Sequence, residues 1–168
     1  MKPWRDILEE LTPRAFRAAA LVLERIERHR VSLDSAYQAV LRNVRLGPSE
    51  ARVAYKLAHR SLLSIGVGKY LLERHGLGAL PLRRKAAFYA ASAVALAEPD
   101  SVSKLESVRG GLLGNRLLNL LKPGSLERVL EGAEELPRAK ALSLRYSLPP
   151  LLVERLLQVL GEREVQRL

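Results

Sequence analysis

Arginines recur on one side of the first strongly periodic segment of the chain, residues 13–29. This stripe consists of Arg14, Arg17, Arg25 and Arg28. On a helix of about 100° per residue these side chains fall within an arc of about 80°, opposite the apolar stripe of the segment. Because a planar guanidinium can hold a phosphate with two hydrogen bonds, the spacing predicts a surface for a polyanion. An ordinary solvated surface, partly neutralised by Glu24 and Glu27, is the alternative interpretation.

Two further groups of cations belong to predicted helices later in the chain. The first group shares one side of residues 50–65 and consists of Arg52, Lys56 and Arg60. The second group opens residues 82–97 and consists of Arg83, Arg84 and Lys85. Cations in a first turn oppose the helix dipole, which favours acids there. They predict a phosphate seat built together with the helix amides, unless these long side chains simply extend into water.

The positive charge of the chain is concentrated before residue 123. The 168 residues carry 28 Lys and Arg against 18 Asp and Glu, a net charge of +10. Residues 1–122 hold 21 of the basic and 11 of the acidic side chains, whereas residues 123–168 hold seven of each. Such asymmetry favours a polyanionic partner, most often a nucleic acid. A thermophile-like composition, rich in Arg and poor in Asn and Gln, fits the same numbers.

The residue types argue against several kinds of chemistry. The chain has no cysteine, which excludes disulfides, thiolate metal sites and a cysteine nucleophile. Its histidines, His29, His59 and His75, lie too far apart for a short metal-ligand spacing. No acid–base pair or nucleophile triad has a recognisable spacing, and the glycines fit no dinucleotide or phosphate loop. We therefore expect no catalytic residue, metal or cofactor in this chain.

Composition and hydropathy are typical of one soluble domain. With 168 residues and 48% hydrophobic side chains, the chain can bury one sizeable core. No apolar run approaches about 18 residues, and the N-terminus lacks the apolar core of a signal peptide. We therefore expect a cytoplasmic protein that does not enter a membrane.

The segment that organises the predicted fold is residues 82–97, LRRKAAFYAASAVALA. After its three cations it leaves no polar face, which is typical of a helix packed on every side. Around it, periodicity predicts helices over 13–29, 33–44, 50–65, 112–121 and 125–136. Thr12, Ser49 and Ser125 are the expected N-caps of three of them. The predicted fold class is all-α, a helical bundle around a central apolar helix.

Glycines and one connection interrupt this helical pattern. Gly66 and Gly68 are expected to loosen the chain between the helix over 50–65 and a segment over 69–75. Residues 101–111 are expected to form a short, partly irregular connection.

Residues 142–161, LSLRYSLPPLLVERLLQVLG, predict a helix ending near Ser147 and a new helix opened by Pro149 and Pro150. This pattern resembles the segment that follows the NusB-like domain in the Sun-type (Fmu) RNA cytosine-5 methyltransferases. The match rests on Arg145, Tyr146, Ser147, Pro149, Leu152, Val153, Glu154, Arg155 and Gly161. Two shorter segments resemble the opening helix and the asparagine-containing helix of NusB-like domains. They contain Arg14, Ala18, Val22, Leu23 and Ile26, and residues 113–118.

The resemblance implies a NusB-like, RNA-binding bundle over residues 1–140. Residues 141–168 resemble the linker towards a methyltransferase domain. In that family the methyltransferase half binds S-adenosylmethionine on an α/β sheet and attacks cytosine with a cysteine. This sequence has neither feature, so we expect that it does not catalyse the reaction by itself. The implied role is an accessory domain that positions RNA, expected to be ribosomal RNA, for a methyltransferase domain in cis or in trans.

The sequence departs from the family pattern at three places. Where the family tends to carry a basic run after its third helix, residues 63–68 are mostly apolar and Lys69 alone is charged. The segment between Pro99 and Leu112 is shortened, and Leu151 replaces the aromatic residue that usually follows the proline. The first departure argues against an RNA contact at that corner.

Two other functions fit the sequence. One is a free NusB-type transcription antitermination factor, which would bind RNA together with a ribosomal protein; the C-terminal pattern argues against it. The other is a helical protein-interaction module whose basic surface reflects only a thermophile-like composition. An RNA affinity that falls with salt would separate the two RNA-binding functions from the third.

Overall fold

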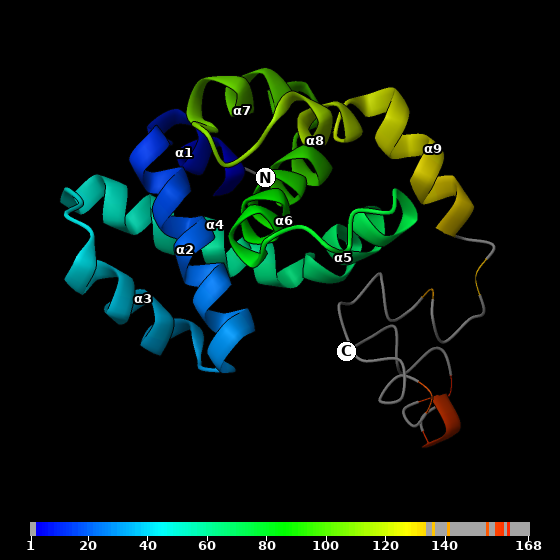
Figure 1. The fold of residues 1–168 in the computed structure, drawn as a ribbon, viewed down its shortest axis with the longest axis horizontal. Helices are drawn as coiled ribbons and strands as arrows, with labels where there is room; N and C mark the ends of the chain where they lie inside the picture. Colours follow the sequence, from blue (N-terminus) through cyan, green and yellow to red (C-terminus); the bar gives the residue numbers. More distant parts are fainter. Residues whose placement is uncertain are drawn as a thin grey trace.

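The computed structural model describes residues 3–133 and the separate positions 136, 141, 154, 157–159 and 161. Its described part is all-α, a packed bundle without strands (Figure 1). The elements are α1 (Pro3–Glu10), α2 (Pro13–His29), α3 (Leu33–Asn43), α4 (Pro48–Leu63), α5 (Ile65–Arg74), α6 (Leu82–Ala97), η1 (Pro99–Ser101), α7 (Val102–Val108), α8 (Asn115–Leu120) and α9 (Pro123–Ala133). The predicted boundary at residue 140 and most of the predicted C-terminal helices lie outside the described residues.

Helix α6 is the centre of the bundle, as its sequence predicted. Every residue from Ala86 to Ala95 is buried. Helices α2, α4 and α5 pack against it, and a single hydrophobic core extends from Ile7 in α1 to Leu126 in α9. The buried Ser92 hydroxyl donates to the carbonyl of Tyr89 at 2.9 Å, so this polar group keeps a hydrogen bond in the core.

The bounds of α2 confirm the prediction at both ends. The Thr12 hydroxyl accepts a hydrogen bond from the backbone N–H of Ala15 at 3.1 Å, and Pro13 occupies the first turn. At the other end Arg30 adopts a left-handed conformation, with φ of 55°, and its N–H donates to the carbonyl of Ile26. The chain then turns into α3, which packs beside α2.

The predicted starts of α4, α8 and α9 were wrong, and a predicted irregular connection contains a helix. Helix α4 begins at Pro48 with Gly47 as its N-cap, because the Glu50 carboxylate accepts the N–H of Gly47; Ser49 is not the cap. Helix α8 covers only part of the predicted segment over 112–121, and α9 begins at Pro123, before Ser125. Residues 102–108 form α7 in the middle of the predicted irregular connection.

The prediction that Gly66 and Gly68 loosen the chain was also wrong. Both lie within α5, and Gly68 is buried where α5 crosses α6. A Cβ at Gly68 would lie 2.8 Å from Cδ1 of Tyr89 and 3.0 Å from Oγ of Ser92. The glycine is required because only a residue without a side chain lets the two helices approach this closely.

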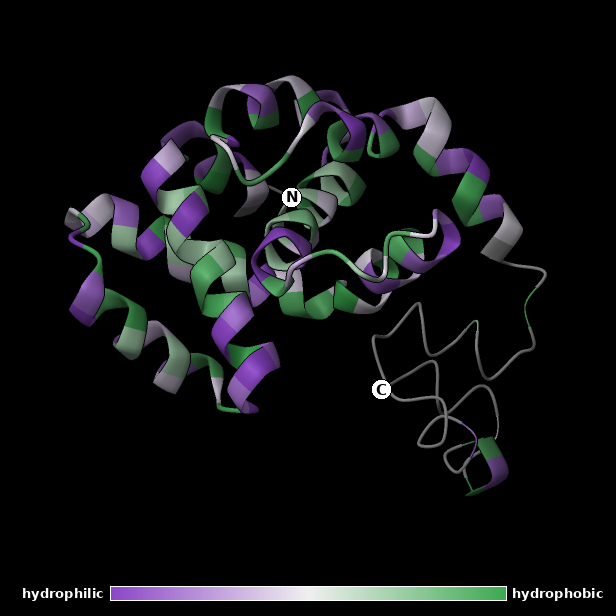
Figure 2. Ribbon diagram, viewed as in Figure 1, coloured by the Kyte–Doolittle hydropathy of each residue, from purple (hydrophilic) through white to green (hydrophobic). Residues whose placement is uncertain are grey.

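Among the described residues, no helix is both long enough and apolar enough to cross a membrane. Figure 2 shows how hydropathy is distributed over the ribbon. Hydrophobic residues concentrate inside the bundle, whereas hydrophilic residues lie along the outer surface of α2 and at the start of α6.

Gly68→Ala is expected to destabilise the protein by about 1–3 kcal/mol, the usual cost of overpacking a core. Replacing glycine by alanine inside a helix normally raises stability by about 1 kcal/mol. A fall in the free energy of unfolding of Gly68→Ala would therefore indicate overpacking. Thermal and urea unfolding measure it. Gly132→Ala in α9 is the matched control, because nothing lies within 4 Å of the position of its Cβ. A Gly68→Ala protein as stable as the control variant would contradict the close crossing of α5 and α6.

Candidate nucleic-acid interface

The four arginines predicted as a stripe on α2 are all solvent-exposed. Helix α2 lies between α3 and α6, so its outer surface has a neighbouring helix on each side (Figure 1). The structure therefore confirms that the four arginines share an exposed side of α2. It also shows that α3 and α6 lie beside this helix, which the sequence pattern did not specify.

A groove of about 270 Å³ lies where the second half of α2 meets α3 and the start of α6. Arg25, Arg28 and His29 line it from α2, and Arg83 lines it from α6. The remaining lining residues are Leu21, Glu24, Ala39, Val40, Asn43 and Val44. Two of the predicted cation groups, 58 residues apart between Arg25 and Arg83, thus contribute to one site.

Glu24 links the cations on both sides of this groove. Its carboxylate accepts from Nε of Arg83 at 2.9 Å and lies 3.9 Å from Nη2 of Arg28. The Glu24 side chain is only 13% exposed, whereas the two arginine side chains are about half exposed. One carboxylate therefore orients two guanidiniums while each keeps a surface towards water.

The other expected neutralising group, Glu27, has a different partner. Its carboxylate lies 3.0 Å from Nζ of Lys69 in α5. This ion pair joins α2 to α5 and leaves Arg25 without a carboxylate partner among the described residues. The groove accordingly contains three guanidiniums and a single carboxylate, so it remains positively charged.

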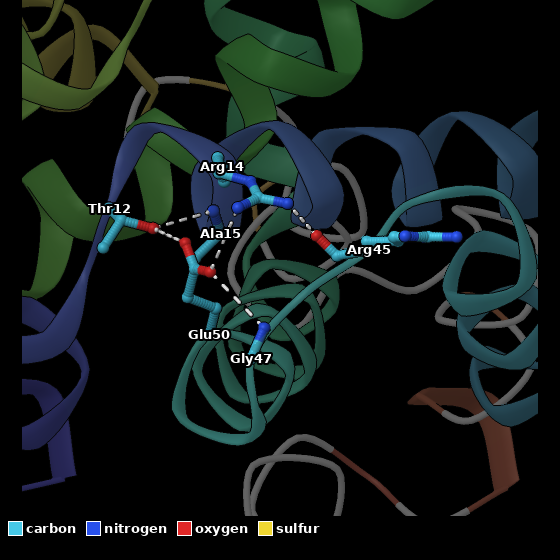
Figure 3. A network of polar contacts seen from close by, with 6 residues as sticks. All are labelled: Thr12, Arg14, Ala15, Arg45, Gly47 and Glu50. Atoms are coloured by element: carbon cyan, nitrogen blue, oxygen red, sulfur yellow. Dashed lines mark hydrogen bonds and ion pairs between the residues drawn. The ribbon is translucent and has the colours of Figure 1, made fainter.

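Arg14 and Arg17, at the start of α2, differ in their surroundings. Arg14 donates to the backbone carbonyl of Arg45, and its Nη1 lies 3.9 Å from the Glu50 carboxylate (Figure 3). It therefore helps to fasten the loop between α3 and α4 to α2. Arg17 has no hydrogen bond or ion pair within the part of the chain that the structure describes, and its guanidinium is available to a ligand.

The cations at the start of α6 have different neighbours. Arg83 reaches Glu24 of α2, whereas Nη2 of Arg84 lies 3.6 Å from the position that a Cβ of Gly114 would take. The backbone N–H groups of Arg84 and Lys85 both donate to the carbonyl of Pro81 at 3.0 Å, which uses two amides of the first turn. Of these three cations Arg83 lines the groove at α2, and the phosphate seat made by all three with the helix amides stays a prediction.

The cations of α4 lie on a separate surface. Arg52 lies 3.7 Å from the carboxylate of Glu10 in α1. Lys56, His59 and Arg60 line a second hollow of about 210 Å³ together with Asp6, Ile7 and Tyr55. This hollow shares no lining residue with the groove at α2, so the ten predicted contact residues do not all line one hollow.

Comparison of the chain with protein-family models, with curated proteins and with solved structures finds no match in any of the three. The resemblance to NusB-like domains therefore stays a prediction. Within the described ranges, no group of three or more His, Asp or Glu side chains is placed to hold a metal ion. The geometry of the groove is consequently the main basis for a function.

The network at the start of α2 predicts that the stability of the bundle falls in acid. The Thr12 hydroxyl donates to the Glu50 carboxylate at 2.6 Å while it caps α2. This hydrogen bond is the main reason why the pKa of Glu50 is lowered from its ordinary value of 4.5; the N–H of Gly47 and the charge of Arg14 lower it further. The ionised carboxylate is thus favoured in the folded state.

Because the folded pKa of Glu50 is depressed, its stabilising effect is present above about pH 4.5 and is lost as the pH falls through the folded pKa. Glu50→Gln should therefore lower the melting temperature at about pH 7, and the difference from the natural chain should shrink at about pH 3. Melting curves at a series of pH values test this. Glu127→Gln, on the exposed surface of α9, is the control; equal effects of the two substitutions would contradict the network.

Proposed function

We propose that this protein is an RNA-binding accessory domain of an RNA cytosine-5 methyltransferase, which positions RNA without catalysing the reaction. One observation carries the RNA-binding part: guanidiniums from α2 and α6 converge on one groove beside α3 in a chain with a net charge of +10. Arginines from two helices that line one groove support a ligand-binding site better than a single charged helix does. Cations that are only solvated have no reason to line a common groove.

The cations suit the sugar–phosphate backbone of RNA. Arg17 and Arg25 are eight residues apart, about 12 Å along the helix axis, which is enough for contacts to several successive phosphates. Such contacts fix the position of a strand and carry little sequence information. A surface of this kind suits a domain that holds RNA while another domain recognises and modifies the base.

The assignment to a methyltransferase rests on the resemblance of residues 145–161, most of which lie outside the described residues. The bundle built around the buried helix α6 is compatible with a NusB-like fold. Chemistry would come from a methyltransferase domain in cis or in trans. Under the antitermination alternative the same groove would bind RNA, and a ribosomal protein would be the additional partner.

Reversal of two charges on α2 tests the RNA-binding surface. Arg17→Glu combined with Arg25→Glu should weaken binding of RNA by about tenfold or more at low salt, and should reduce the slope of affinity against salt by about one to two phosphate contacts. Filter binding or fluorescence anisotropy over a salt series measures both. These positions are preferable to Arg14, whose reversal would also disturb the Glu50 network.

The matched control is Arg74→Glu combined with Arg128→Glu. These exposed arginines lie in α5 and α9, line neither hollow, and give the same change in net charge. If both double variants lose affinity equally, binding follows net charge and not the groove. If the natural chain binds RNA weakly with no dependence on salt, the protein-interaction module becomes the better interpretation.

A further inference from the structure

The groove at α2 has an apolar floor beneath its cations. Ala39 and Val40 of α3 are only 6% and 7% exposed, and Leu21 of α2 and Val44 are half-buried beside them. Phosphate alone does not require such a floor, since a phosphate is held by donors and charge. The combination of apolar carbon and guanidinium groups instead matches a nucleotide, which has a flat base attached to an anionic backbone.

A polar group at the edge of the floor suits the rim of a base. Asn43 ends α3 and lines the groove, and its amide nitrogen donates to the carbonyl of Ala39 at 3.1 Å. This bond orients the amide group. The Oδ1 atom accepts no hydrogen bond from the described residues, so it is available to an N–H donor of a ligand.

The size of the groove limits the ligand. Its volume of about 270 Å³ lies just below the range of about 300–1,000 Å³ that is typical of sites for whole small molecules. An open groove of this size accommodates a fragment, such as one base with its phosphate, and leaves the remainder of the molecule outside. Bases inside a duplex are stacked and paired, so only an unpaired strand can present a base in this way.

We propose that the groove between α2, α3 and α6 binds one unstacked nucleotide of single-stranded RNA. The base lies against Leu21 and Val40 with its edge at Asn43, and the backbone phosphate lies on Arg25 and Arg28. This inference rests on the proposed function, because it uses the same surface. It adds that the protein prefers unpaired RNA to a duplex of equal charge.

The test removes the Asn43 amide from the groove without changing its charge. Asn43→Leu should weaken binding of a single-stranded RNA of about 12 nucleotides by about tenfold, because the edge of the base loses its hydrogen-bond partner. The slope of affinity against salt should stay the same, and binding of a blunt-ended duplex with the same number of phosphates should change less than about twofold. Gln38→Leu, at an exposed position of α3 that lines neither hollow, is the control.

A second measurement does not depend on a variant. A single-stranded RNA with a photoreactive 4-thiouridine should crosslink to residues 39–44 of the natural chain. Crosslinks only elsewhere, or an equal affinity for the single strand and the blunt-ended duplex, would overturn the inference. The proposed function would still stand in those cases if the Arg17 and Arg25 reversals weaken binding, and it would fail separately if they do not.

Discussion

Close packing of small side chains between α2 and α6 is the constraint on which the rest of the structure depends. The buried side of α2 includes Ala15, Ala18, Ala19 and Ala20, and α6 is alanine-rich over the ten residues that are fully surrounded by protein. Alanine allows helix backbones to approach closely and loses no side-chain entropy on burial. Because α6, α4 and α3 together cover the apolar side of α2, its arginine side faces the solvent.

The same contact decides which cations meet. With α6 fixed against α2, the first turn of α6 lies near Glu24, and Arg83 bonds to that carboxylate. Glu24 also lies near Arg28, so one acid holds an arginine from each helix. Exposed ion pairs contribute little to stability, usually below about 1 kcal/mol. The effect of this pair on geometry is therefore more important than its effect on folding, since it places two guanidiniums at one groove.

Several helix bounds could be predicted from the sequence, whereas contacts between helices distant in the sequence could not. The bounds of α2 and α6 could be predicted, because Thr12 with Pro13 marks a helix start and an all-apolar segment marks a central helix. Helix α5 could not be predicted, since the glycines that lower helix propensity are needed for a contact that only the tertiary structure reveals. Local propensity and close packing conflict at Gly68, and packing prevails.

The candidate site shows the same difference. Helical spacing placed Arg17, Arg25 and Arg28 on one exposed side, as the structure confirms. No spacing rule could show that Arg83 meets Arg25 and Arg28 in one groove, or that Lys56 and Arg60 line another hollow. Both facts depend on how helices distant in the sequence pack together. The pairing of Arg14 with the loop before α4 was equally beyond a pattern within one helix.

Helix α2 therefore has two ends with different tasks. At its start, Thr12 bonds to Glu50 in the first turn of α4, and Arg14 bonds to the carbonyl of Arg45 in the loop before α4 (Figure 3). At its end, Arg25 and Arg28 stand over an apolar floor that α3 supplies. A helix held firmly at one end and along its buried side presents the other end with little freedom to rearrange. If this surface binds RNA as proposed, a fixed helix backbone would lower the entropy lost on binding, and the network at the start of α2 would favour binding at its end.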